Sequence, residues 1–287
     1  MEKIKCRFCG SKNIAKRGFR KTQNRGLIQR YICRKCNKSF AVNDGFLRMR
    51  NNPNKITSAI DLYLSNLSSR KTRNFFRRHL EHNASHVTIL NWCLKYIKRV
   101  DKYTRKLKPN ISGKIYLDET EINCKGKYHF LWVGVDWDTR FIPSSQYTTF
   151  RSCEKAREIF DDIKSKGNTK FVQTDSAMFY PYAFRKSFAY HKRKNNEVEH
   201  RVINTRRTGK YNVRIETVFS KLKDRIDDFR SLKSKECAEI LIKGLILQHN
   251  FIEQHSTTGK IPCELAGINL ELGKDRWMDL IKLSSMN

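Results

Sequence analysis

The segment KIYLDETEINCKGKYHFLWVGVDWDTRFIPSSQYT, residues 114–148, decides the fold of this chain. It contains three consecutive runs rich in β-branched and aromatic residues, and a helical pattern at residues 153–166 follows it. A fourth run of the same kind, TKFVQTD, occupies residues 169–175. Short apolar runs bounded by turn residues predict strands. We therefore expect an α/β fold, a mixed sheet with helices on its faces.

The region after the fourth strand is predicted to be mainly helical. It begins with a short helix and an irregular basic stretch, and it continues with a long helix and an apolar helix. These segments are expected at residues 180–188, 191–210, 211–229 and 238–255. The whole unit would span residues 111–258, and we interpret residues 259–287 as a C-terminal tail.

Four cysteines near the start of the chain have the spacing of a metal site. They form two CxxC pairs, Cys6 with Cys9 and Cys33 with Cys36, and 23 residues separate the pairs. Two such pairs bind one tetrahedral ion through four thiolates, and zinc is the usual occupant. A chain without an export signal does not favour disulfides, although unligated thiols or a redox pair remain alternatives. We therefore predict a zinc ribbon at residues 1–45 with a structural Zn²⁺ ion.

A break at residues 51–54 separates this unit from a region with helical periodicity. Three helices fit residues 53–108, and this arrangement suits a helix-turn-helix, in which the last helix enters the major groove of DNA. An ordinary helical connector is the alternative. Basic side chains in this region and in the ribbon favour DNA binding on electrostatic grounds. The residues that we expect to contact DNA from these two units are Arg17, Arg20, Arg73, Arg77 and Lys95.

The charge balance of the chain indicates a polyanionic partner. Lys and Arg number 59 against 28 Asp and Glu, so the formal net charge is +31. Nucleic acid is the leading partner at such a balance, and a basic protein without such a partner or a membrane surface are weaker alternatives. The first residues lack the pattern of a secretory signal, and no run of about 18 apolar residues occurs. We therefore expect a cytoplasmic protein with no membrane partner.

Three acids lie where the predicted elements could bring them together. Asp118 ends the strand-like run KIYL, Asp175 ends the fourth strand, and Glu216 lies near the start of the long helix. Carboxylates that share a cleft can hold a pair of Mg²⁺ ions, which need hard oxygen ligands. Each acid alone is better explained as a turn residue or a helix cap. Neighbouring acids remain competitors by position, namely Glu119, Glu121, Asp136 and Asp138.

Several motifs from Lys114 to Ile268 have to be considered together. They are LDETEI, Gly126 with YHFLWVGVDWDTRFI, TDSAMFYPYAF, RIETVFSKLKDRIDDFRS and LQHNFIEQHSTTGKIPCELAGI. In this combination the chain resembles the transposases of bacterial and archaeal insertion sequences, most closely the insertion sequence six family. One departure is that the family usually has an asparagine three residues before the glutamate, where this chain has Val213, with Asn212 one step further off.

The resemblance implies a ribonuclease-H-like fold for the sheet domain and a catalytic triad at Asp118, Asp175 and Glu216, with Mg²⁺ or Mn²⁺ as cofactor. A basic residue seven positions after the glutamate is a family feature, and Lys223 occupies that place. We also expect Arg225 to hold DNA near the scissile phosphate. The implied enzyme is a polynucleotidyl transferase, a DNA transposase that binds the terminal inverted repeats of its element, cuts them and joins them to target DNA.

The resemblance also implies a prokaryotic, nucleoid-associated protein and a homodimer, because two DNA ends must be brought together. Two other functions stay open at this point. One is a non-catalytic DNA-binding regulator derived from a transposase, and the other is a nuclease that hydrolyses DNA without joining it. The second differs from a transposase only in whether water or a DNA hydroxyl attacks the phosphate.

Overall fold

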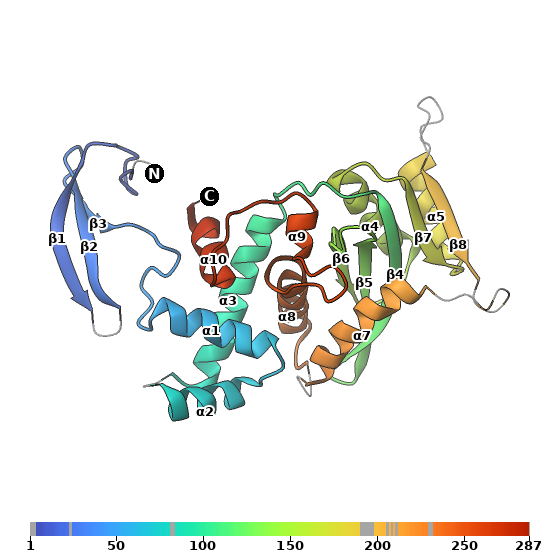
Figure 1. Cartoon of the computed structure of the whole chain (residues 1–287), viewed down its shortest axis with the longest axis horizontal. Coiled ribbons are helices and arrows are strands. Elements are labelled where there is room, and N and C mark those ends of the chain that lie inside the picture. Colours follow the sequence, from blue (N-terminus) through green and yellow to red (C-terminus); the bar gives the residue numbers. More distant parts are fainter. Residues whose placement is uncertain are drawn as a thin grey trace.

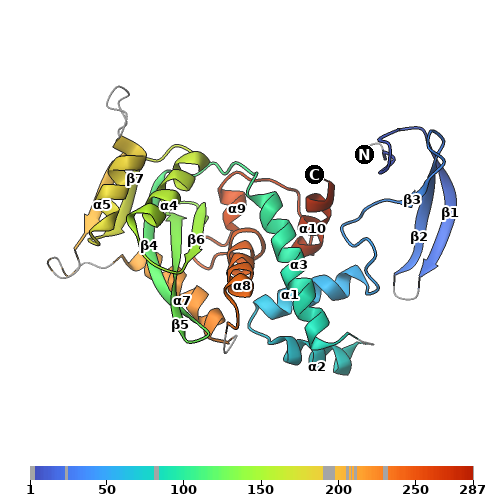
Figure 2. The same cartoon turned by 180° about the vertical axis from the view of Figure 1, so that it is seen from behind.

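The computed structural model shows a small sheet, a helical region and a larger sheet with helices, arranged side by side along the longest axis (Figures 1 and 2). It describes residues 4–22, 25–80, 84–189, 198–204, 207, 209, 212–228 and 232–286. None of the helices in these ranges is both long and apolar enough to cross a membrane.

The small sheet is antiparallel and belongs to the N-terminal ribbon. Strand β2 pairs with β1 on one side and with β3 on the other. Cys6, Cys33 and Phe40 form a separate small core at one end of this sheet. Figure 1 shows the ribbon apart from the rest of the molecule, joined to it by the segment before α1. Strands β1 (Ile14–Thr22) and β2 (Gly26–Cys33) form a hairpin between the two CxxC pairs, and β3 (Ser39–Ala41) follows the second pair.

The helical region contains the three expected helices, and each begins at a side-chain cap. The side chains of Asn52, Ser68 and Ser85 accept hydrogen bonds from backbone N–H groups of the first turns, and so satisfy donors that a helix start leaves unpaired. Helix α3 is the central one, because it packs against α1, α2, α8 and α10. The bounds are α1 (Pro53–Leu64), α2 (Ser69–His79) and α3 (His86–Thr104).

The last segment of the chain is not a tail. It contains the short helix α9 (Pro262–Leu265) and the helix α10 (Arg276–Met286), and α10 packs against α1 and α3. Trp277 and Leu280 of α10 are buried in the main core, at 2% and 0% exposure. Tertiary packing thus gives the segment a structural role, which its Gly- and Pro-containing sequence did not indicate.

The larger sheet has the strand order β6-β5-β4-β7-β8. Strands β4, β5 and β6 are antiparallel neighbours, whereas β7 pairs parallel with both β4 and β8. A mixed sheet of this kind with flanking helices is the ribonuclease-H-like arrangement expected above, so the fold prediction is confirmed. The strands are β4 (Lys114–Cys124), β5 (Lys127–Asp136), β6 (Ser144–Thr148), β7 (Phe171–Asp175) and β8 (Glu199–Ile203).

Strand β8 corrects the expectation of an irregular stretch at residues 191–210. Strand β8 lies at the edge of the sheet and is largely in contact with solvent. Neither of its faces has to be apolar throughout, so its sequence, EHRVI, shows no regular alternation of apolar and polar residues. Its pairing with β7, rather than a local pattern, makes it a strand. Residues 191–197 of that stretch lie outside the described residues.

Helices cover both faces of the sheet. Figure 1 shows α7 in front of β4 and β5, and Figure 2 shows α4 on the opposite face. A Cβ atom on Gly134 of β5 would lie 3.0 Å from Ile163 of α4, so the sheet and α4 pack closely. The helices and π-helical turns of this unit are α4 (Cys153–Lys166), α5 (Phe179–Phe184), η1 (Arg185–Ala189), α7 (Val213–Asp228), α8 (Lys235–Leu247) and η2 (Gln248–Ile252).

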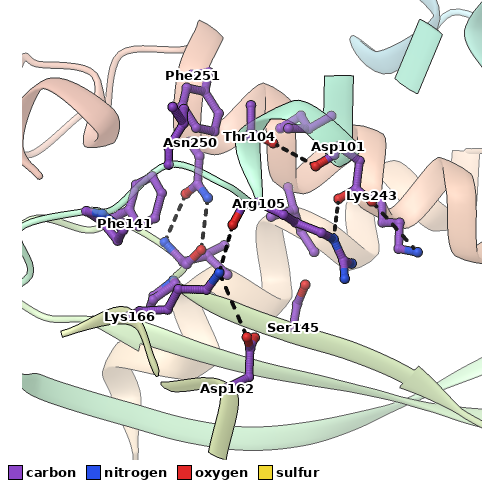
Figure 3. A pocket seen from close by; sticks show the side chains of 16 residues that line it. Asp101, Thr104, Arg105, Phe141, Ser145, Asp162, Lys166, Lys243, Asn250 and Phe251 are labelled. Atoms are coloured by element: carbon purple, nitrogen blue, oxygen red, sulfur yellow. Dashed lines mark hydrogen bonds and ion pairs between the residues drawn. The ribbon is translucent and has the colours of Figure 1, made fainter. Parts of the chain in front are cut away.

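The helical region and the sheet domain share one hydrophobic core. Helix α8 packs so closely on α3 that a Cβ atom on Gly244 would lie 2.6 Å from Ile97. At the seam between the two units, the side chain of Asn250 exchanges two hydrogen bonds of 2.9 Å with the backbone of Ile142. A cavity of about 220 Å³ lies at this seam. Lys166 lines it and donates a hydrogen bond to the backbone carbonyl of Arg105 (Figure 3). The described charged groups around the cavity pair with one another, so we interpret it as a domain junction.

Candidate active site

Two neighbouring parallel strands carry the first two candidate acids. The β4–β7 register ends with Tyr116 paired to Gln173, and both Asp118 and Asp175 lie two residues further along their strands. Asp118 and Asp175 are therefore level with each other where the pairing of the two strands ends. Strand β4 itself continues to Cys124, so the expectation that Asp118 ends its strand was wrong.

The third candidate acid lies on α7, which packs on β4 and β5. Glu216 is in the first turn of this helix, as expected, and its side chain is exposed. Ile215, Val218 and Phe219 bury the neighbouring side of α7 against the core. An apolar stripe on one side of the helix thus presents Glu216 on the side that faces solvent.

The three carboxylates interact electrostatically. Burial, the adjacent Glu119, Asp175 and Glu216 all raise the pKa of Asp118, to about 7, against the lowering effect of its hydrogen bond with the Glu119 N–H. That N–H donates to Asp118 Oδ1 at 2.9 Å, and the Ala177 N–H donates to Asp175 Oδ1 at 2.9 Å. Asp118 is thus repelled by both other acids, and carboxylate oxygens are a donor set that suits hard divalent cations such as Mg²⁺ or Mn²⁺.

The competing acids have structural roles. Asp136 is fully buried and accepts hydrogen bonds from Ser112, Thr139 and the Gly113 N–H. Asp138 forms a surface ion pair with Lys114 at 2.9 Å.

Glu119 and Glu121 are also engaged. Glu119 pairs across the strands with Trp132, which packs on α5, so its side chain faces α5 rather than α7. It accepts hydrogen bonds from Tyr180 and Arg151 there. Glu121 is exposed and lies 3.9 Å from the same arginine. These four acids therefore have partners of their own, although Glu119 also acts electrostatically on Asp118 and Asp175.

Asn212 is a residue that sequence reasoning noted only as a departure from a motif. It is 6% exposed, its carbonyl accepts from the N–H groups of Ile215 and Glu216, and its side-chain oxygen accepts from Gln173 Nε2 at 3.2 Å. Gln173 lies two residues before Asp175 on β7. The bond therefore joins the start of the helix that carries Glu216 to the strand that carries Asp175.

Lys223 and Arg225, which were expected to act near the scissile phosphate, differ in their surroundings. Lys223 is exposed and lies two turns after Glu216 on the same side of α7. Arg225 instead forms an ion pair with Glu253 at 2.5 Å, and its side chain is only 22% exposed. Its charge is thus neutralised within the chain, and we revise its role from DNA contact to positioning.

Glu253 belongs to a hydrogen-bonded network that reaches the helical region. Gln248 donates to Glu253 at 3.2 Å and to Asp61 of α1 at 2.9 Å, and it accepts from Trp277 of α10 at 2.8 Å. Gln248 is 1% exposed, so these bonds are made away from water. Through Arg225 and Gln248, the helix of Glu216 is tied to the helices of the neighbouring region.

The four cysteines of the ribbon converge. Sγ of Cys6 lies 3.7 Å from that of Cys36, and Sγ of Cys9 lies 3.6 Å from that of Cys33. Four sulfur atoms about 2.3 Å from one central zinc ion would be about 3.8 Å apart, so the spacing fits a tetrahedral site. Within the described residues, this is the one group of three or more Cys, His or acid side chains whose ligand atoms lie within 4.8 Å of one another.

The basic residues expected to contact DNA lie on two units. On the ribbon, Arg20 is exposed, and Arg17 is exposed although it donates to Ser39. On α2, Arg77 is exposed and Arg73 is partly covered.

Helix α2 has the character of a basic surface helix. It contains five Lys and Arg and no acid, and it buries only Thr72 and Phe76. Lys95 of α3 is exposed, and its ammonium group donates to Met49 and lies over the ring of Tyr96. The exposed start of α3 instead presents Val87 and Asn91.

The family comparison matches the part of the chain that holds the three acids. The profile of the family described as the DDE domain of IS240-type transposases matches residues 112–255, which is half of the chain. No curated protein is similar enough to count as a match.

Solved structures of low similarity were also found. They include the simian T-cell lymphotropic virus intasome in complex with PP2A regulatory subunit B56 gamma, at 16% identity and a TM-score of 0.41, covering 64% of this chain and 65% of that chain. The magnesium-bound HTLV-2 integrase catalytic core domain in its trimeric form has 16% identity and a TM-score of 0.40, covering 56% and 98%. The BIV integrase catalytic core domain has 12% identity and a TM-score of 0.39, covering 54% and 93%. The chain thus spans less than two thirds of the first of these.

Proposed function

Because this chain belongs to the DDE transposases, we propose that it binds the ends of an insertion sequence and catalyses metal-dependent cleavage and transfer of DNA strands. The observation that carries the proposal is that Asp118 and Asp175 lie level on the paired strands β4 and β7, while Glu216 lies in the first turn of α7, which packs on β4. All three acids lie inside the matched region.

In this proposal the three carboxylates supply the oxygen ligands of the catalytic cations. When bound, a pair of Mg²⁺ or Mn²⁺ ions activates the attacking hydroxyl and stabilises the leaving oxygen. Asp118 and Asp175 are held level by paired strands, and Asn212 and Arg225 fix the helix that carries Glu216. Lys223, exposed on the same side of α7, provides a positive charge for the DNA phosphate.

The other units bind DNA in this proposal. The four cysteines hold a structural Zn²⁺ ion that keeps the ribbon folded. The basic surface of α2 and the exposed start of α3 bind the terminal repeats, and the net charge of +31 supports a polyanionic partner. A homodimer would bring two ends together.

Replacing Asp175 by Asn tests the catalytic role directly. The variant is expected to lose strand transfer on DNA from the element's own ends with Mg²⁺ or Mn²⁺, while its affinity for those ends stays within about threefold, because metal ligation and not binding is lost. Asp138→Asn is the matched control, since that acid is ion-paired on the surface, and it should keep full transfer. Retained transfer in Asp175→Asn would remove the residue from the active site.

The same assay separates the alternative functions. A wild-type chain that binds the ends but neither cuts nor joins them would be a DNA-binding regulator. A chain that cuts the ends without joining them would be a nuclease.

A further inference from the structure

The hairpin end of the ribbon exposes two large apolar side chains. Phe19 of β1 is 64% exposed and Leu27 of β2 is 66% exposed. The strand register pairs Phe19 with Gln29 and Lys21 with Leu27, and directly opposed residues of an antiparallel pair share a face of the sheet. Phe19 and Leu27 therefore lie on the same face, next to each other.

This face continues into the core of the ribbon. Side chains alternate along β2, so Tyr31 and Cys33 lie on the same face as Leu27. Cys33 supplies one of the four sulfur atoms, and Tyr31 packs against the core that Cys33 forms with Cys6 and Phe40. The core therefore covers the cysteine end of this face and leaves its hairpin end uncovered.

A β-bulge determines which way Phe19 points. The register shifts between Lys16 and Phe19, and Gly18 in this stretch has a φ of 65°, which favours glycine. The side chain of Gln29 donates to the carbonyls of Gly18 at 2.9 Å and Arg30 at 2.8 Å. The amide of Gln29 is thus used to hold the bulge, and the exposure of Phe19 follows from a fixed local structure.

The chemistry around the two apolar side chains indicates their partner. The sequence between Ile14 and Cys33 contains no acid and six basic residues, which are Lys16, Arg17, Arg20, Lys21, Arg25 and Arg30. Arg25 is ion-paired with Asp44 and its side chain is only 11% exposed, so the other five supply the local positive charge. Lys16 pairs with Tyr31 and Lys21 with Leu27, so both lysines share the apolar face. A surface that combines exposed apolar side chains with charges of one sign matches DNA, which offers bases beside phosphates.

We propose that this face of the β1–β2 hairpin lies against duplex DNA, with Phe19 and Leu27 contacting bases and Lys16 and Lys21 contacting phosphates. A two-stranded ribbon fits the major groove, where apolar side chains contact the methyl group of thymine. The inference deepens the DNA-binding part of the proposed function and rests on it. It adds that the ribbon contacts the bases of DNA as well as its phosphate backbone.

A second copy of this chain is the alternative occupant of the face. A symmetric contact between two copies would set Lys16 and Lys21 of one against the same residues of the other, or close to them. Like charges that lose water on contact repel each other. The lysines therefore favour DNA over self-association.

The salt dependence of binding separates base contacts from phosphate contacts. The probe is a fluorescein-labelled duplex from an end of the element, titrated with the full-length chain without added Mg²⁺, over a series of salt concentrations. Phe19→Ala is expected to lower affinity roughly ten- to a hundredfold with an unchanged salt slope, because apolar burial is lost and no phosphate contact is. Lys21→Ala is the matched control on the same face, and it should lower the slope of log K against log salt by about 0.9. Phe19→Trp should restore most of the affinity.

Three results would overturn the inference. The first is an unchanged affinity of Phe19→Ala with zinc content at the wild-type level. The second is a changed salt slope in Phe19→Ala. The third is a loss of dimer in the DNA-free Phe19→Ala chain while its DNA affinity is kept, which would assign the face to a second copy. The assay measures binding alone, so a chain that binds in the expected way but never joins DNA would overturn the proposed function and leave this inference in place.

Discussion

Replacing Asp118 by Asn should stabilise the cation-free protein at alkaline pH while it abolishes catalysis. The pKa of Asp118 is raised from 3.8 to about 7, first by burial and then by neighbouring acids. The folded state therefore holds a proton that the unfolded state releases, so the stability of the wild type falls as pH rises from about 3.8 to about 7. Asparagine carries no charge at these pH values, so the variant does not lose stability over this pH range.

The size of the effect follows from the shift. Each pKa unit corresponds to about 1.4 kcal/mol, so the gain of Asp118→Asn at about pH 8 has a ceiling of about 4 kcal/mol. We expect about 2 kcal/mol or more, since the site is only partly screened by solvent. At about pH 4 the difference between variant and wild type should fall below about 0.5 kcal/mol, because both folded forms are then neutral.

Urea unfolding followed by tryptophan fluorescence, without divalent cations, measures this difference. Trp132 and Trp277 are buried reporters in the sheet and in α10. Asp138→Asn is the control, and loss of its surface ion pair with Lys114 should cost at most about 1 kcal/mol at either pH. A gain of Asp118→Asn that is the same at both pH values, or a loss of stability at about pH 8, would refute the electrostatic account of this site.

Two further predictions concern the ribbon and the domain junction. Cys33→Ser should remove zinc, as measured by atomic absorption, and open the ribbon to proteolysis, because the binding energy of such a site is folding energy; an intact wild-type chain that contains no zinc would contradict the zinc assignment. Gln248→Ala should lower the free energy of unfolding by about 2–3 kcal/mol, since it leaves the buried Trp277 N–H and the Asp61 carboxylate without their partner. A urea measurement that finds a loss below about 0.5 kcal/mol would show that Gln248 does not hold the junction.

Much of the architecture could be predicted from local patterns. The two CxxC pairs indicated the sulfur cluster, because ligand spacing is a local property. The apolar runs around residues 114–175 gave four strands and the helix between them, since each carries its own periodicity. Asp175 at the end of β7 and Glu216 in the first turn of α7 were also placed correctly.

The features that were missed depend on contacts between distant segments. β8 becomes a strand through its pairing with β7, and α10 is ordered by its packing on α1 and α3. The ion pair of Arg225 with Glu253 spans 28 residues, and no spacing rule connects them. Asp118 lies inside a longer strand because β5 continues to pair with β4 after β7 has ended. Propensity and periodicity describe one segment at a time, so they do not report such pairings.

Strand transfer in vitro is the most direct test of the central claim. Purified wild-type chain, Glu216→Gln and the control Glu121→Gln would each be offered DNA that carries the ends of the element, with Mg²⁺ or Mn²⁺ and with no added cation. The account predicts joined products with the wild type and with Glu121→Gln when the cation is present, and none with Glu216→Gln. Joined products from Glu216→Gln, or DNA that the wild type binds but never cuts or joins, would contradict it.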